Sequence, residues 1–558
     1  MKRMSVSTNT PPKTSIDYLK RLLMKINSFL KIFSVLFVCF FIHISVLSSC
    51  KNKDKNKTYS PDSTVYSNQN FTELSLDSEA VISFIKNNPI PSNLSNEVVD
   101  FYTNRNHQLG WFNKSGMTCA APNFYNQLQS YNRDFDDNSL NNVQLDTLMK
   151  QFEANEKLFL SDTKKIQQLD LILTTTFFKY AEKVYGGTTK KASDLEWFIP
   201  RKKKNYQVVI DSLVSSELCE KLQEPVNQYY IRLRQQLKLY RTIQKNGGFP
   251  LIITDKKSIA VGDSDSCLLG LKKYLVLSED LKIDDNSIVF TDSLAKALLN
   301  FQKRMGLFES GKLNQQTIKE INKPVEFRIK QMMVNMERLR WIPVEMEKDY
   351  LLINIPEFRL HIFENEKPLW NTNVVVGKEV KQTSIFKGNM SQIILNPYWG
   401  IPTSIVRNEI LPLIRRNRNY LSQNNMEVIN GNYRQKPGKN NALGKMKFMF
   451  PNNYHIYLHD TPSKGLFGET KRAFSHGCIR VENPKKLVNY LLRNNSEWNP
   501  EKVDKILLTD VQTGIRINPT VPVYIAYFTV WVDINGQLNF RNDLYDLDKK
   551  LSQEVFGD

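Results

Sequence analysis

The sequence predicts an α+β protein built from several domains, on three observations. Its 558 residues exceed what one compact core usually organises. Apolar residues recur at helical spacing through much of residues 80–245. Residues 346–545 change to short alternating or β-branched segments, which are typical of strands. We therefore expect a helical scaffold, a small helical module and a β-rich domain, in that order.

The first 50 residues are typical of a segment that directs a chain to a membrane. An uncharged run over residues 32–47 follows four basic residues and ends in the tetrapeptide LSSC, whose last residue is Cys50. That ending resembles the lipobox of bacterial lipoproteins, in which Cys50 would carry the lipid. An uncleaved signal anchor is the alternative. Met24 begins a more conventional signal, so translation starting at Met24 is an alternative in which residues 1–23 are a start-site artefact. Residues 51–79 are polar and are expected to form a flexible tether.

Residues 80–245 are expected to form the helical scaffold. Ile166, Leu169 and Leu173 begin an apolar face that repeats at three- and four-residue steps, and Gly186-Gly187 ends it. No residue of this region forms a pattern with catalytic chemistry. We therefore assign it a structural role.

Residues 246–324 are expected to form a separate small module. A helical stripe contains Leu294 and Leu298, with Asp292 as its expected N-cap, and a second short helix covers residues 314–321. Such a stripe is more often core than ligand site. The run nevertheless resembles the small helical peptidoglycan-binding module, whose signature positions are occupied by Phe301, Gln302, Gly306, Leu307, Gly311 and Thr317.

Residues 325–345 should form a connecting helix, after which the β-rich domain covers residues 346–545 and a tail covers 546–558. Asn535-Gly536 gives a strong hairpin signal between two strands late in the domain. A basic, partly helical insertion at residues 403–445 interrupts the strands, and insertions of this length are commonly lids. Its arginines are Arg407, Arg415, Arg416, Arg418 and Arg434.

Histidines point to the chemistry, because three of the chain's six lie within 22 positions. They are His455, His459 and His476, and Cys478 lies two residues after the last of them. A cysteine nucleophile needs an imidazole to take its proton, and an oxyanion site that a preceding glycine makes sterically possible. Metal binding by His459, His476 and Cys478 and a buried inert Cys478 are the alternatives, but no CxxC or HxxxH spacing supports a metal.

The segment from His459 to the Ser-His-Gly-Cys-Ile-Arg block resembles the catalytic signature of the L,D-transpeptidases, with Cys478 19 positions after His459. Further runs, including NMERLRWIP, NPYWGIP and FMFPNNYHIYLHDTP, resemble the large YcbB-type members over roughly residues 80–545. Those members have a helical scaffold, a peptidoglycan-binding module and a catalytic domain with a capping insertion. The lipobox-like N-terminus departs from the plain signal or anchor that is usual in the family.

The resemblance implies that the Cys478 thiolate attacks a peptidoglycan stem tetrapeptide, with His459 as general base and acid. Asp460 or its carbonyl would lie near the imidazole, and His476 and Gly477 would supply oxyanion donors and shape. The expected substrate contacts are Tyr457, Ser475, Arg480 and Arg434, although a structural salt bridge is an equal alternative for Arg480. No metal or organic cofactor is required, and carbapenem-type inhibitors are expected to react.

Three alternatives stay open at this point. Water instead of an amine could resolve the thioester, which would make the chain an L,D-carboxypeptidase or endopeptidase, and a non-catalytic wall-binding lipoprotein is the other class.

The formal charge is +19, of which residues 1–50 contribute +6, from seven basic residues against Asp17. Acidic residues are interleaved throughout the chain, so we expect no nucleic-acid partner but attraction to a polyanionic wall, on the periplasmic side of the cell envelope.

Overall fold

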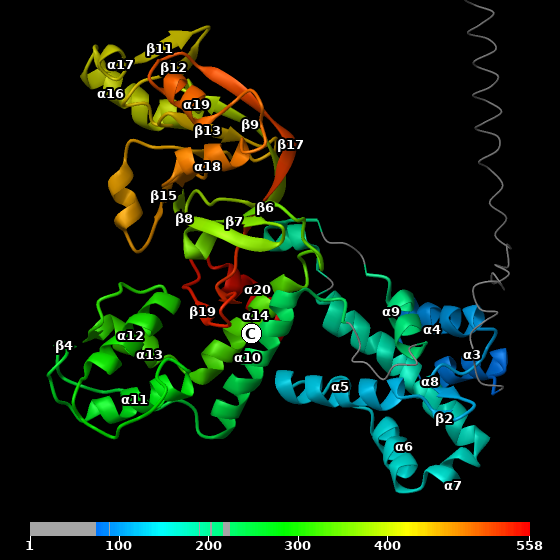
Figure 1. Ribbon diagram of the computed structural model, residues 1–558. Helices are drawn as coiled ribbons and strands as arrows, with labels where there is room; N and C mark the ends of the chain where they lie inside the picture. The colour runs from blue at the N-terminus through cyan, green and yellow to red at the C-terminus, as the bar shows by residue number, and fades with distance from the viewer. Residues whose placement is uncertain (1–73, 89, 189, 201–203, 216–223, 558) are drawn as a thin grey trace, which may run out of the picture. The chain divides into compact units, whose positions relative to one another are not determined.

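The computed structural model describes residues 74–557 except 89, 189, 201–203 and 216–223 (Figure 1). The predicted signal, Cys50 and most of the tether lie outside these residues. The α+β organisation is confirmed, with helices through residue 245 and a large sheet in the second half of the chain. None of the helices in the described part of the chain combines the length and apolar character that crossing a bilayer requires.

The scaffold is a set of helices packed around α8 (Thr163–Tyr180), whose residues 169–178 are all buried. This helix continues into a π-helical turn, η1 (Ala181–Gly186), and ends at Gly187 with a φ of +73°. The predicted helix and its end are therefore confirmed. The other elements are α3 (Ser78–Asn87), α4 (Ser92–Asn104), β1 (Phe112–Asn113), β2 (Gly116–Met117), α5 (Ala120–Phe135), α6 (Val143–Ala154), α7 (Glu156–Leu160), η2 (Ala192–Leu195), β3 (Trp197–Phe198), α9 (Tyr206–Val214) and α10 (Gln228–Lys245).

The small module contains α11 (Cys267–Leu277), α12 (Asp292–Arg304) and α13 (Gln315–Ile321), with β4 (Ser258–Ile259) paired to β5 (Leu313–Asn314). The expected N-cap of α12 was wrong by one residue: Thr291 accepts from the backbone N–H of Leu294, because its extended backbone places its hydroxyl over the first turn. Gln302 is buried and bonds to Ser310, Gly311, Lys312 and Thr317. Its role is to hold the loop between α12 and α13.

The large sheet runs in the order β13-β14-β16-β8-β7-β6-β17-β9-β3, and a further pairing of β13 with β9 closes it into a ring. Strands β14 and β16 are parallel neighbours in this sheet. The corresponding ends of the two strands therefore lie at the same edge of the sheet. The strands are β6 (Tyr350–Asn354), β7 (Arg359–Glu364), β8 (Lys367–Gly377), β9 (Ile385–Leu395), β13 (Met446–Met449), β14 (Leu458–His459), β15 (Ala473–Ser475), β16 (Ile479–Val481) and β17 (Thr513–Ala526). Short helical elements accompany them: η3 (Ile355–Glu357), η5 (Lys464–Gly468), α18 (Pro484–Leu491) and α19 (Pro500–Leu507).

The insertion between β9 and β13 folds around an apolar cluster of its own. Ile401, Ile405, Val406 and Ile410 are buried together, separately from the main core. Its elements are β10 (Trp399–Gly400), α15 (Thr403–Ile405), η4 (Val406–Ile410), α16 (Leu411–Arg416), α17 (Tyr420–Gln423), β11 (Met426–Ile429) and β12 (Asn432–Gln435). The partly helical character that the sequence predicted is confirmed.

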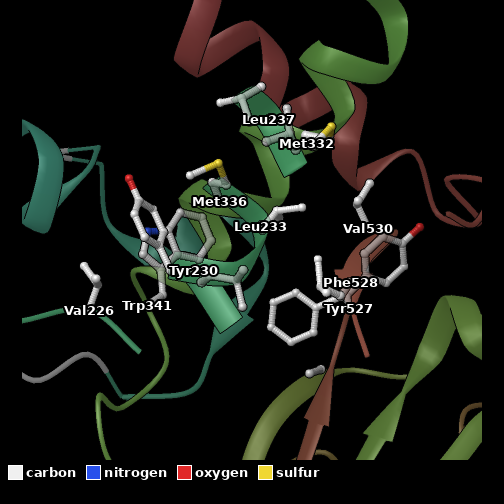
Figure 2. Close-up of a cluster of buried hydrophobic side chains, with 14 of the residues drawn as sticks. Val226, Tyr230, Leu233, Leu237, Met332, Met336, Trp341, Tyr527, Phe528 and Val530 are labelled. Carbon is white, nitrogen blue, oxygen red and sulfur yellow. The ribbon is translucent and has the colours of Figure 1, made fainter. Parts of the chain in front are cut away.

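The connecting helix α14 (Val325–Leu339) packs beside α10, and both contact the chain that follows β17 (Figure 2). Trp341 lies 5.4 Å from Trp197, and Trp197 lies 5.8 Å from Phe528, between ring centroids. The predicted hairpin is confirmed as β18 (Val530–Val532) paired with β19 (Leu538–Phe540). Within the segment expected as a tail, helix α20 (Leu547–Phe556) forms, and its Leu547 and Leu551 are buried.

Candidate active site

Cys478 lies on the short loop between β15 and β16, and hydrogen bonds within the loop fix its shape. Ser475 Oγ donates to the carbonyl oxygen of Cys478 at 2.6 Å and accepts from the N–H of Gly477 at 3.1 Å. Gly477 has a φ of +112°, which favours glycine, and its carbonyl oxygen accepts from Thr383 Oγ1. The N–H of Gly477, one of the expected oxyanion donors, is thus bonded to Ser475 in this structure.

The Cys478 thiol lies in a half-buried position beside Tyr457. Its sulfur is 3.7 Å from the carbonyl oxygen of His455. Burial raises the pKa of the thiol above its ordinary value, whereas hydrogen bonds from the backbone and side chain of Tyr457 and the charge of Lys447 act in the opposite direction. The resting thiol is thus protonated at neutral pH, and forming the thiolate requires a base.

His459 is buried on β14, and β14 pairs with β16, the strand that begins directly after Cys478. Strand β14 pairs His459 with Arg480 of β16, two residues beyond Cys478. The Nδ1 atom bonds to the carbonyl oxygen of Asp460, so Nδ1 carries the proton and Nε2 is left as the acceptor. Burial and then the charge of Arg480 lower the pKa of His459 to about 3, which leaves the ring neutral and able to accept a proton.

Of the two expected partners of the imidazole, the Asp460 carbonyl bonds to it, and the Asp460 carboxylate makes other contacts. It accepts from the N–H of Lys445 at 2.9 Å and pairs with Lys464, while its own N–H bonds to the carbonyl oxygen of Met446. Asp460 therefore fastens the end of the insertion to the strand that carries His459. Only its backbone carbonyl touches the imidazole.

One face of β13, β14 and β16 carries five candidate site residues: Lys447, Tyr457, His459, Cys478 and Arg480. Lys447 stands opposite His459 across β13 and β14, and its ammonium lies 3.9 Å from the ring centroid of Tyr457. Tyr457 and His459 have ring centroids 5.7 Å apart, and Arg480 follows Cys478 by two positions. Sequence reasoning missed Lys447, because a cross-strand neighbour 31 positions before Cys478 leaves no local signal.

Neither Lys447 nor Arg480 forms a salt bridge with a described carboxylate, and Nε of Arg480 is buried without a hydrogen-bond partner. The salt-bridge alternative for Arg480 therefore finds no support among the described residues.

No group of three or more His, Cys, Asp or Glu side chains is arranged to hold a metal in the described parts of the chain.

The insertion touches this face at two points. His476, whose side chain is exposed, bonds through Nε2 to Glu409 at 3.0 Å, and the Trp399 side chain bonds to Tyr457. Arg434, expected to contact substrate, instead pairs with Glu427 and lies over the ring of Tyr398 at 4.2 Å. The structure thus brings Tyr457, His459, Cys478 and Arg480 together and leaves Arg434 within the insertion.

Comparison with known proteins bears on both halves of the chain. Residues 348–525 match the model of the YkuD L,D-transpeptidase catalytic domain, and residues 96–237 match the model of the Scaffold domain. A protein of Haemophilus influenzae with the provisional name L,D-transpeptidase is 29% identical over 243 residues, which cover 39% of this chain and 48% of that protein. The chain thus spans about half the length of this relative.

Solved structures with some likeness include L,D-transpeptidases from two bacteria. That of Stackebrandtia nassauensis is 12% identical with a TM-score of 0.20, over 50% of this chain and 97% of that one. That of Xylanimonas cellulosilytica is 14% identical with a TM-score of 0.17, over 49% and 100%. Scores this low carry no weight for the fold or the function of this chain. Residues 348–525 therefore resemble the L,D-transpeptidase catalytic domain, and residues 96–237 resemble the Scaffold domain.

Proposed function

We propose that this chain is a cysteine-dependent L,D-transpeptidase that acts on the stem tetrapeptides of peptidoglycan. The observation that carries the proposal is a neutral, buried His459 with an available Nε2 on the same strand face as Cys478. This is the donor and acceptor pair that thiol acyl transfer needs. The match of residues 348–525 to the catalytic-domain model supports it independently.

In the acylation step, the thiol of Cys478 turns from the His455 carbonyl and passes its proton to Nε2 of His459. The sulfur attacks the carbonyl carbon of the third stem residue. The bond to the terminal D-alanine breaks, its nitrogen takes the proton from the imidazolium, and a thioester remains on Cys478. Because His459 is neutral at rest, it can act first as base and then as acid.

In the second step, an amine of another stem attacks the thioester. The amine loses a proton to His459, the carbon–sulfur bond breaks, and the sulfur regains a proton as thiol. Use of the side-chain amine of a diamino acid gives a 3→3 cross-link, and use of a free D-amino acid gives exchange. Water in place of the amine gives a tripeptide, which is the L,D-carboxypeptidase reaction.

Two features support substrate binding around this centre. The guanidinium of Arg480 has no carboxylate partner among the described residues, so it is available to a stem carboxylate or carbonyl. The module at residues 246–324 resembles a peptidoglycan-binding fold, and we propose that it binds glycan strands. Its signature residue Gln302 acts within that fold and not as a ligand contact.

We propose that the protein works on the periplasmic side of the cell envelope as a membrane-anchored lipoprotein. The lipobox-like sequence ending at Cys50 motivates the proposal. Cys119 is disulfide-bonded, which supports an oxidising compartment outside the cytoplasm.

Replacing Cys478 tests the proposed chemistry. We expect Cys478→Ala and Cys478→Ser to abolish turnover of tetrapeptide while thermal unfolding stays near that of the parent, because a serine hydroxyl lacks the low pKa that an imidazole exploits in a thiol. Labelled D-amino acid distinguishes the two reactions: incorporation into muropeptides indicates transfer, and tripeptide alone indicates hydrolysis.

A carbapenem provides a second readout on the same residue. Mass spectrometry of the parent should place a covalent adduct on the peptide that contains Cys478, and Cys478→Ala should remain unmodified. Substantial turnover by Cys478→Ala, or an adduct on a different residue, would overturn the assignment.

A further inference from the structure

Two unpaired cations stand on either side of the strand that carries His459. Lys447 lies on β13 and Arg480 on β16, and β14 runs between them. A lysine in a half-buried position usually finds a carboxylate partner, yet Lys447 forms no salt bridge with any described residue. Its ammonium rests instead on the ring of Tyr457, 3.9 Å from the centroid.

Tyr457 connects this lysine to the nucleophile. Both its backbone and its hydroxyl hydrogen-bond to Cys478, while Trp399 from the insertion bonds to the same side chain. A cation on the ring therefore fixes the side chain that holds the thiol. The position also brings a positive charge close to a sulfur that must become negative during catalysis.

The two cations act on different groups. The charge of Lys447 favours the thiolate of Cys478 and the neutral form of His459. Arg480 acts on His459. The other charged or titratable groups around Cys478 are Tyr457, His459 and, at the rim, His476 with its partner Glu409. No described carboxylate faces the sulfur directly, so Lys447 is the cation that offsets the burial of the thiol.

We propose that Lys447 is a positioning residue for acyl transfer, which holds Tyr457 against Cys478 and stabilises the negative charge on its sulfur. The proposal rests on the proposed function for its biological meaning. Its electrostatic part is independent of any peptidoglycan substrate. The two can therefore fail separately.

The test measures alkylation of Cys478 in Lys447→Met, Lys447→Gln and Lys447→Arg, with the Cys478 peptide quantified by mass spectrometry so that Cys267 does not contribute. The matched control is Lys387→Met, because Lys387 also lies over a tyrosine ring, Tyr524 at 5.0 Å, on strand β9. Iodoacetamide reports thiolate formation as a function of pH. Iodoacetate, which is anionic, additionally reports a local positive charge.

We expect the neutral variants to move the pH profile for iodoacetamide upward by about 1 unit, the lower end of what an adjacent opposite charge produces. The rate ratio of iodoacetate to iodoacetamide should fall severalfold. Lys447→Arg should restore both quantities, and Lys387→Met should change neither. Acylation by a carbapenem at pH 7 should slow about tenfold in the neutral variants.

Unchanged profiles and ratios in a folded neutral variant would overturn the role of Lys447, whatever the enzyme does with tetrapeptide. Lys447→Gln keeps a polar side chain, so it serves if Lys447→Met fails to fold. A shifted profile in a chain whose parent shows no muropeptide chemistry would instead support Lys447 and overturn the proposed function.

Discussion

The hydrogen bond at Nδ1 of His459 decides which ring nitrogen is left to accept a proton. The Asp460 carbonyl holds the proton on Nδ1, so the orientation is set by backbone and not by a carboxylate. A neutral acceptor that needs no charged partner suits a buried site, because a charged imidazole there would be poorly solvated. Replacing His459 by Gln should lower turnover about 10²-fold or more, in line with general acid–base contributions.

The control for that variant is His476→Gln. His476 bonds to Glu409 at the rim, so its loss should cost much less than the loss of His459. Steady-state release of D-alanine from tetrapeptide measures both variants. A mild effect at His459 together with a severe effect at His476 would mean that His476 is the base.

The lowered pKa of His459 also predicts how stability depends on pH. The unfolded chain has an imidazole pKa near 6.5, and the folded value is about 3, so between these values the unfolded state binds more protons. The stabilisation is present above pH 6.5 and is lost as the pH falls toward 3. His459→Gln should therefore reduce the loss of unfolding free energy between pH 7 and pH 4, measured by urea denaturation, and an unaltered pH dependence would contradict the assignment.

The sequence was sufficient to single out His459 and Cys478 as the candidate catalytic pair, because both lie in one short, histidine-rich segment. It was insufficient for Lys447 and Thr383, whose roles depend on strand register and loop closure. The hydrogen bond from the N–H of Gly477 to Ser475 was also beyond the sequence, because it depends on the rotamer of Ser475, and composition does not fix a rotamer.

The insertion is attached to the catalytic strands through a tight contact at Gly444. That residue has a φ of +62°, and a Cβ there would lie 2.4 Å from the carboxylate of Asp460. Gly444→Ala should therefore cost the strain of a left-handed backbone, about 1 kcal/mol, and additionally displace the carboxylate that holds Lys445.

Gly431→Ala is the matched control, because Gly431 has a φ of +78° and open space around its Cβ position. The difference between the two variants in unfolding free energy isolates the contact with Asp460. We expect Gly444→Ala to be the less stable by about 1–2 kcal/mol in denaturant titrations. Equal stabilities would show that the carboxylate moves aside freely.

We propose that the insertion acts as a lid over Cys478. It has its own apolar cluster and reaches the active face through Glu409 and Trp399. Replacing residues 406–442 with a short Gly/Ser linker should raise the KM for tetrapeptide and lower transfer relative to hydrolysis, since water would then reach the thioester.

Alkylation of Cys478 by a small reagent should stay the same or become faster in that variant. Circular dichroism establishes that it folds. If a folded deletion variant keeps both the KM and the ratio of transfer to hydrolysis, the insertion is no lid, and its exposed arginines serve solubility.

The domains of the described chain are joined by more than their linkers. Strand β3, which comes from the helical half, pairs in parallel with β9 of the catalytic sheet, and its Trp197 packs on Trp341 and Phe528. A strand of two residues between helices gives no periodic signal, so the sequence could predict the domains but not this junction. Helix α20 was not predicted either, although its Leu547, Leu551 and Val555 recur every four residues.

How the whole protein is held at a membrane is predicted by its N-terminal sequence, which lies outside the described residues. If Cys50 carries a lipid, Cys50→Ala should block processing of the signal or release the protein from membranes, because stable anchoring takes two or more acyl chains and none could then be attached. Fractionation of cells into membrane and soluble pools, with the mass of the mature N-terminus, measures both outcomes.

Ser49→Thr, which leaves Cys50 in place, is the control and should stay membrane-bound. A Cys50→Ala protein that is fully processed and fully membrane-bound would rule out the lipid anchor. An unprocessed protein that stays on the membrane would be held by residues 32–47 alone, which is how a signal anchor behaves in the absence of lipidation.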